Sequence, residues 1–234
     1  MLHDRTGHPV SGATVEALAS FETALAQLHC LIGNPLQAAD AAIAAAPDFA
    51  MAHLLRAYLY LSRMDVSGIA PGQRSLATAR RLAWTERETL HVLAAEAWAG
   101  GRLAAAAACF DDVLIANPRD SLALQMAHLI DFHRGDMRSL HVRVRRILPA
   151  WSAALPHLHA MLHMLAFGLE QPAGRHSRNV DPRAPGALEN FMALHNWWHL
   201  VLHHLDREEH VETPCALSRY AAAPLQQMAM ISKS

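Results

Sequence analysis

The chain has 234 residues, of which 52% are hydrophobic and 18% charged, and its formal net charge is -1. This length can form one large or two small domains, with enough apolar surface for a substantial core. A nearly neutral charge gives no reason to expect a nucleic-acid surface or attraction to an anionic membrane. We therefore expect neither nucleic acid nor a membrane among the partners.

The cysteines and the N-terminal residues bear on the compartment. Cys30, Cys109 and Cys215 are too few and too scattered for a disulfide framework, and no CxxC pair occurs. The first residues, "MLHDRTGHPV", lack the apolar segment of a secretory signal. No stretch approaches the ~18 uninterrupted apolar residues of a membrane-spanning helix. We expect a cytoplasmic protein.

Helix-forming residues dominate the chain, and the alternating β-branched runs typical of strands are missing, which predicts an all-α fold. Gly33, Gly68, Gly101 and Gly135 are separated by 35, 33 and 34 residues, and each is expected at a turn between two helices. This is the tetratricopeptide period. The sequence therefore predicts a tetratricopeptide-like α–α superhelix, a solenoid of helical hairpins.

The clearest repeat covers residues 87–120. Gly101 is expected to make its turn, Ala106 to allow the two helices to cross closely, and Phe110 to fill the groove between them. Pro118 ends the second helix, because proline cannot donate a hydrogen bond within a helix. Each such hairpin leaves an apolar face open, which stacking on its neighbours would close.

Two other segments repeat parts of this unit. Residues 41–49 have the same ending, with Pro47, although the second helix is about one turn short. The unit that begins at 121 keeps Gly135 but has lost most other characteristic positions. Near its end, the basic run "RVRR" at 143–146 is expected to be a solvated helix face rather than a nucleic-acid patch.

Motifs for nucleotide binding or α/β-hydrolase chemistry (GxxxxGK[ST], GxGxxG, GxSxG) are absent from the sequence. Histidines in two later helices are the remaining candidates for chemistry. In the predicted helix 156–171, His159, His163 and Glu170 share one narrow stripe. Two imidazoles and a carboxylate on one face can form half of a metal site or an acid–base site.

The second histidine helix, at 191–206, contains the stretch "HNWWHLVLHH". Trp198 lies in the apolar stripe that is expected to face the core. His195 borders this stripe and His199 lies one step further round, so the two can act together as an i, i+4 pair. The other histidines of the stretch point elsewhere.

Two interpretations of these histidines remain open. In the first, His159 and His163 meet His195 and His199 across a helix interface, where four nitrogen ligands would suit zinc or another divalent ion, and Glu170 lies nearby. In the second, no cofactor is present and the histidines are partly buried, hydrogen-bonded to the backbone or to one another. HxxxH spacings occur readily by chance in a chain with 17 histidines.

The order of these segments resembles the tetratricopeptide repeat protein 38 family, over roughly residues 4–171 and again over about 189–207. "AFGLE" and especially "HNWWH" are its specific parts. The resemblance implies an α–α superhelix in which late histidine helices recur, but no established activity. It carries over to His159, Glu170, His195, Asn196, Trp197, Trp198 and His199, whereas His163 rests on spacing alone.

The chain departs from the family after residue 171, because the family has further repeats before "HNWWH". We expect repeats over 1–171, a loop replacing the missing repeats over 172–190, a terminal helix over 191–210 and an atypical tail, for which disorder is one expectation, over 211–234. An internal deletion or a frameshift would explain both the gap and the tail. In that case the chain is a shortened product without activity of its own.

Protein or peptide binding is the expected function, because solenoids expose a long concave surface and nothing in the sequence requires chemistry. The alternative is a metal-binding or hydrolase-like enzyme that uses the histidines and Glu170 between the 156–171 and 191–206 helices. In that alternative Glu170 is the acid–base residue and the metal activates water.

Overall fold

A computed structural model describes residues 1–151, apart from the side chains of Met137 and His141. The elements in chain order are β1 (Leu2–His3), β2 (Pro9–Val10), α1 (Val15–Cys30), α2 (Pro35–Ala45), α3 (Ala50–Leu61), α4 (Val66–Leu82), α5 (Glu86–Ala99), α6 (Leu103–Ala116), α7 (Ser121–Arg134), α8 (Met137–Ile147) and the 3₁₀ turn η1 (Leu148–Ala150). The all-α prediction is confirmed for these residues. The exception is β1–β2, an antiparallel hairpin whose strands have two residues each. Strands this short leave no alternating pattern in the sequence.

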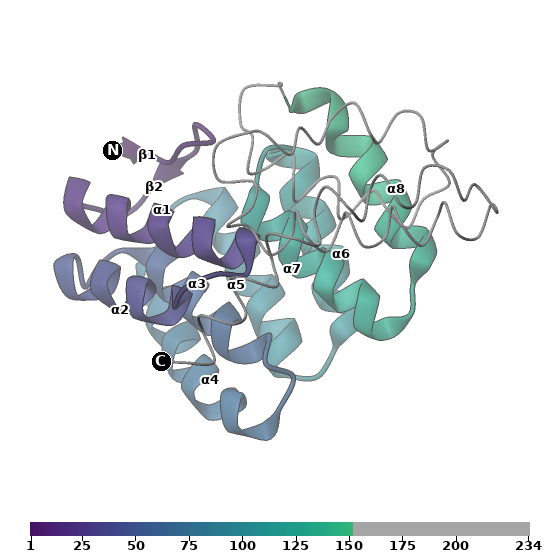
Figure 1. Cartoon of the computed structure of the whole chain (residues 1–234), viewed down its shortest axis with the longest axis horizontal. Helices are drawn as coiled ribbons and strands as arrows, with labels where there is room; N and C mark the ends of the chain where they lie inside the picture. Colours follow the sequence, from purple (N-terminus) through teal and green to yellow (C-terminus); the bar gives the residue numbers. More distant parts are fainter. Residues whose placement is uncertain (152–234) are drawn as a thin grey trace, which may run out of the picture. The chain divides into compact units, whose positions relative to one another are not determined.

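The eight helices form four consecutive hairpins: α1–α2, α3–α4, α5–α6 and α7–α8 (Figure 1). Their first helices begin at Val15, Ala50, Glu86 and Ser121, so successive hairpins start 35, 36 and 35 residues apart. Each hairpin also packs on the next, through α2 on α3, α4 on α5 and α6 on α7. The period expected from the glycines is therefore present in the helices themselves.

The packing inside the third hairpin follows the expectation for its small and aromatic residues. Ala106 and Phe110 are fully buried on α6. The Phe110 ring lies 5.5 Å from that of Tyr58 on α3 and 6.0 Å from the imidazole of His91 on α5, measured between ring centroids. Phe110 thus joins its own hairpin to the preceding one. Aromatic pairs at this separation stabilise a core beyond the area that they bury.

The second helices differ in length as the sequence predicts. α2 has 11 residues and α6 has 14, a difference of three residues or nearly one turn. Both end two residues before a proline, Pro47 or Pro118.

Three of the four glycines lie in turns between the helices of a hairpin. Gly33, Gly101 and Gly135 have φ angles of 63°, 74° and 69°, in the left-handed region that glycine enters without a Cβ clash. Gly135 is also the C-cap of α7.

The prediction for Gly68 is wrong, because this glycine lies inside the first turn of α4. The turn before it contains Met64, which takes the left-handed conformation with a φ of 54°. Gly68 is buried, and a Cβ placed on it would lie 2.2 Å from the carbonyl oxygen of Tyr60. The sequence repeat selects a small residue here for the close approach of α3 and α4 rather than for a turn.

The expectation of a solvated "RVRR" face is wrong for its first arginine. Arg145 and Arg146 are exposed, but the side chain of Arg143 is only 3% exposed. Its Nε lies 3.0 Å from Oδ1 of Asp111, and its Nη1 lies 2.5 Å from Oδ2 of Asp131. Helical spacing puts Arg143 on the same face as the buried Ile147, so the charge enters the interface between α8 and its neighbours and is neutralised there.

No helix among residues 1–151 is long and apolar enough to cross a membrane. The remaining parts of the predicted organisation lie outside the described residues: the end of the repeat region (152–171), the 172–190 loop, the 191–210 helix and the 211–234 tail.

We predict that Gly68→Ala destabilises the protein by about 1–3 kcal/mol, because the new methyl group overlaps the Tyr60 carbonyl and forces α3 and α4 apart. The sign is diagnostic, since the same substitution inside an unobstructed helix stabilises by about 0.5–1 kcal/mol. Urea unfolding at neutral pH measures the difference. Gln73→Ala, at an exposed position of the same helix, serves as the control and should change stability by less than about 0.5 kcal/mol. A more stable Gly68→Ala protein would contradict the close helix approach.

Candidate functional site

The residues predicted from the sequence to form a site all lie outside the described part of the chain. These are His159, His163, Glu170, His195, Asn196, Trp198 and His199. Within residues 1–151, buried charged side chains are concentrated at another place. There the loop of the β1–β2 hairpin meets the first turn of α5 and the start of α7.

Arg87, in the first turn of α5, is the centre of this buried network. Its Nε lies 2.6 Å from Oδ2 of Asp120, and its Nη1 lies 3.0 Å from Oδ2 of Asp4. The three side chains are at most 6% exposed. A buried guanidinium requires this pairing, because an unpaired charge in a protein interior is strongly destabilising.

Asp4 is held in place by the loop of the β1–β2 hairpin. Its Oδ1 accepts hydrogen bonds from the backbone N–H groups of Thr6 and His8, both at 3.0 Å, and from the hydroxyl of Thr6 at 2.7 Å. This local turn leaves Oδ2 free to meet Arg87. Aspartate favours such turns because its short side chain bonds to its own backbone two residues on.

Asp120 combines a local and a long-range role. It is the N-cap of α7, where its Oδ1 accepts from the N–H of Ala123 at 2.8 Å. Its Oδ2 contacts both Arg87 and Nε2 of His91, the latter at 2.9 Å. The start of α7 is therefore fixed to α5 by one carboxylate.

Tyr58 extends the network to α3. Its hydroxyl donates to the carbonyl oxygen of His91 at 2.8 Å and lies 3.1 Å from Nδ1 of the same residue. Tyr58, His91 and Asp120 are completely buried. The contacts that run from Asp120 through His91 to Tyr58 are therefore closed off from solvent.

The network keeps Asp120 and Asp4 ionised and Tyr58 protonated at neutral pH. Burial alone would raise the pKa of Asp120, but the charge of Arg87 and the contact with His91 hold that pKa well below its usual value. For Asp4, burial is likewise outweighed by the hydrogen bond with His8 and by Arg87, so the pKa is lowered. Burial and the charge of Asp120 raise the pKa of Tyr58 well above its usual value, so this hydroxyl stays protonated at neutral pH.

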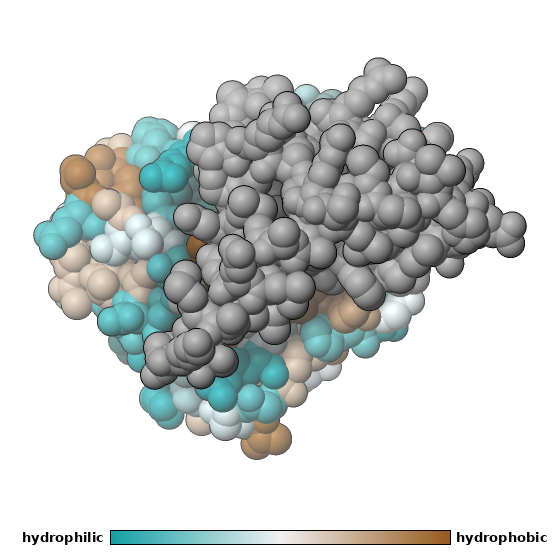
Figure 2. Space-filling view, viewed as in Figure 1, coloured by the Kyte–Doolittle hydropathy of each residue, from teal (hydrophilic) through white to brown (hydrophobic). Residues whose placement is uncertain are grey.

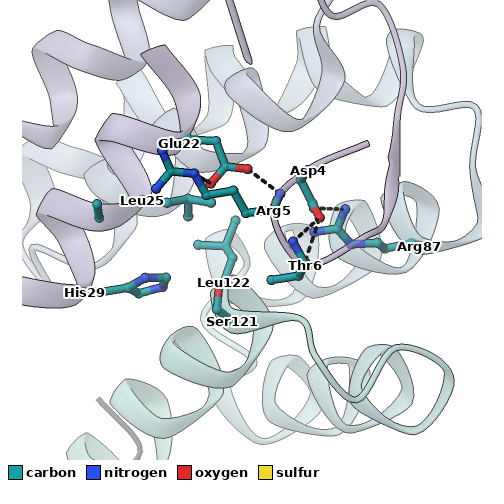
Figure 3. Close-up of a pocket in the computed structure, with 10 residues that line it drawn as sticks. Asp4, Arg5, Thr6, Glu22, Leu25, His29, Arg87, Ser121 and Leu122 are labelled. Carbon is teal, nitrogen blue, oxygen red and sulfur yellow. Dashed lines mark hydrogen bonds and ion pairs between the residues drawn. The ribbon is translucent and has the colours of Figure 1, made fainter. Parts of the chain in front are cut away.

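The exposed side of the network is a small pocket between the N-terminal loop, α1 and the start of α7 (Figure 3). Glu22 and His29 line it from α1 and Ser121 from α7, with Asp4 and Arg87 at one side. The pocket has about 30 Å³ of open space, which is room for about two water molecules. Its lining combines the ion pair of Asp4 and Arg87 with Glu22 and His29.

No group of three or more histidine, cysteine, aspartate or glutamate side chains in residues 1–151 is arranged to hold a metal ion. The described network joins the β1–β2 hairpin, α3, α5 and α7, which are distant in the sequence.

No family model matches the chain, and no solved structure matches it. The resemblance to the tetratricopeptide repeat protein 38 family therefore stays a prediction.

Sequence reasoning missed this network, although a signal for it was present. In "RETLHVLAAEAW" the polar residues Arg87 and His91 are spaced i, i+4 on a face that continues with the buried Ala94 and Trp98. Polar residues in the apolar stripe of a helix indicate a buried polar contact. The partners could not be found in the same way, because Asp4 and Asp120 lie 83 and 33 residues away.

We predict that Asp120→Asn lowers the free energy of unfolding by about 3 kcal/mol at neutral pH, because it leaves Arg87 with one carboxylate. Asparagine is also a good N-cap, so the loss reports on charge rather than capping. The pKa of Asp120 is lower in the folded than in the unfolded protein, so its contribution is complete above the unfolded value and is lost as pH falls below about 4. The difference between wild type and variant should therefore shrink in acid.

Urea unfolding between pH 7 and pH 3 tests this prediction. Asp112→Asn, which changes an exposed aspartate, is the matched control and should behave as wild type at each pH. An Asp120→Asn deficit that stays constant down to pH 3 would show that the charge of Asp120 is not what stabilises the fold.

Proposed function

We propose that this protein is a tetratricopeptide-like superhelical scaffold that binds a protein or peptide. The observation that carries the proposal is the repetition of four hairpins whose first helices start 35, 36 and 35 residues apart. Arrays of this period stack helix pairs in one direction and expose extended surfaces, which partners use for binding. The resemblance of the sequence to the tetratricopeptide repeat protein 38 family supports the same architecture.

The form of the described network also supports a scaffold. Its most reactive combination, Asp120–His91–Tyr58, is fully buried, and the adjoining pocket holds about 30 Å³. Buried groups that are ion-paired and hydrogen-bonded in this way make a fold more rigid. In a scaffold, such rigidity keeps the binding surface in one shape before the partner arrives.

Several large apolar side chains are available on the surface as contact points. Trp84, in the loop between α4 and α5, is 81% exposed, and Val66 at the start of α4 is 84% exposed. Phe132, in the last turn of α7, is 67% exposed. On the face shown in Figure 2, hydrophobic and hydrophilic residues are mixed over α1 and α2. Tryptophan is enriched among residues that dominate binding energy, so Trp84 is the first candidate.

A selection from a random peptide library, displayed on phage and screened against the purified full chain, tests the scaffold proposal. We predict enriched peptides that share a sequence pattern and bind with micromolar Kd in fluorescence anisotropy. Trp84→Ala should weaken this binding about tenfold, since loss of a hot-spot side chain costs more than about 1 kcal/mol. Gln73→Ala is the control for an exposed change on α4, the helix before this loop, and should bind as wild type.

Two outcomes would count against the proposal. A selection that enriches no sequence pattern would contradict peptide binding by the array. Enriched peptides that bind equally to Trp84→Ala, Val66→Ala and Phe132→Ala would contradict the role assigned to these exposed apolar residues.

The alternative function, a metal-dependent site formed by His159, His163, His195 and His199 with Glu170, rests on helical spacing in the sequence. It predicts about one divalent metal ion per chain in the purified protein, and a reduced content in His159→Ala and His199→Ala. Elemental analysis by plasma mass spectrometry measures this content. Metal-free protein with a Tm unaffected by a chelator would remove this alternative and leave the scaffold.

A further inference from the structure

Residues 1–13, which include the β1–β2 hairpin, contact the first three helical hairpins of the array. The backbone N–H of Arg5 donates to Oε1 of Glu22 on α1 at 2.8 Å. The carbonyl of Ser11 accepts from the N–H of Ala50, the first residue of α3, at 3.3 Å. In Figure 1 this segment lies beside α1.

The strongest attachment of this segment is to α5. Asp4 forms its ion pair with Arg87 at 3.0 Å. Ser11 donates twice to Glu88, from its backbone N–H at 2.8 Å and from its hydroxyl at 2.7 Å. Glu88 also closes the capping box of α5 with Thr85, so the segment is tied to the start of that helix.

The segment reaches the fourth hairpin through Arg87, which pairs with Asp4 and with Asp120 at the start of α7. The first and fourth hairpins face each other across the small pocket, with Glu22 on one side and Ser121 on the other (Figure 3). They are also joined by a hydrogen bond from Nε2 of Gln125 to the carbonyl of Leu28, at 3.3 Å.

This arrangement departs from an ordinary repeat array, in which each repeat contacts its neighbours alone. One short segment here bridges repeats that are not adjacent. We propose that residues 1–13 form a releasable strap that sets the curvature of the array: docked, the strap holds the first and fourth hairpins together, and detached, it lets them separate. This inference does not depend on what the array binds.

The strap is suited to separate release because its attachment is mainly polar. Among residues 1–13, Val10 is the buried hydrophobic side chain, at 1% exposure, whereas Asp4 and Ser11 are the buried polar ones. A two-stranded hairpin of this size is not stable by itself. Segments with few buried apolar contacts open at lower free energy than the core, as local units.

Release has a defined structural consequence. It opens Arg87, Glu88 and the pocket to water, and it removes the bridge from Asp4 through Arg87 to Asp120. The first and fourth hairpins then keep the Gln125–Leu28 hydrogen bond, which contributes little net free energy, and the apolar side chains of Leu25 and Leu122 that line the pocket between them. Loss of the polar bridge therefore lets the angle between these two hairpins vary more.

Hydrogen–deuterium exchange of the full chain, wild type and Asp4→Asn, tests the strap. The reporters are the amides of Arg5 and Ser11, whose acceptors Glu22 and Glu88 are unchanged in the variant. We expect these amides to exchange at least tenfold faster in Asp4→Asn, while amides of α3 change less than threefold. Small-angle X-ray scattering should show a larger radius of gyration for the variant. Asp112→Asn is the control and should match wild type in both measurements.

Two results would overturn the proposal. Equal acceleration of the strap and α3 amides would show that the segment is an inseparable part of the core, and unchanged strap exchange would show that Asp4 does not hold it. If Asp4→Asn does not fold, exchange of the wild type in low urea decides the question. Exchange of the strap amides must then depend less on urea concentration than exchange of the α3 amides. The same urea dependence for both groups would refute a separate strap.

Discussion

The described part of the protein depends on how one buried cation is neutralised. The Arg87 guanidinium is buried with two carboxylates that neutralise it, and these come from distant parts of the described sequence, Asp4 and Asp120. Each carboxylate is fixed by its own local turn or helix cap. The guanidinium therefore determines where the N-terminal hairpin and the start of α7 lie relative to α5. The completely buried His91 and Tyr58 then connect the same carboxylate to the aromatic core between α3, α5 and α6.

This ion-pair network changes how a repeat architecture behaves. Four hairpins of nearly equal spacing would form an open array whose stability is a sum of neighbour contacts. A bridge from residue 4 through residue 87 to residue 120 adds contacts of high sequence separation. Unfolding the first hairpin therefore disturbs the third and fourth, and cooperativity should exceed that of a simple solenoid. The buried Arg143 repeats the principle at the other end, where it joins α6, α7 and α8 through Asp111 and Asp131.

Much of the helical organisation could be predicted from the sequence, because it follows from local chemistry. Helix propensity, glycine turns and the prolines after α2 and α6 act within a few residues, and the spacing of the glycines shows how often this local pattern recurs. The failures are also physical. Gly68 matched the period but serves a close helix contact, and one-dimensional spacing cannot separate a turn from a crossing. Arg143 was placed in solvent because its acidic partners, 32 and 12 residues away, are invisible to a local pattern. The same limit hid Asp4 and Asp120, whereas the histidines that the sequence emphasised lie outside the described residues.

The buried ion pairs and the exposed apolar side chains lie in different parts of the described structure, and both bear on where a functional site is expected. Interior groups such as Asp120 and Arg87 have pKa values displaced so that they stay charged, and the pocket beside Arg87 has about 30 Å³ of open space. Perturbed pKa values often mark reactive sites, but structural ion-pair networks produce the same displacement. The burial of Asp120 and Arg87 favours the structural explanation for these two residues, because a reactive group must meet its substrate. Large apolar side chains such as Trp84, which is 81% exposed, lie on the surface together with charged ones such as Arg80. In the proposed scaffold, the buried ion pairs would keep the array in one shape, and exposed aromatic side chains such as Trp84 would contact the partner.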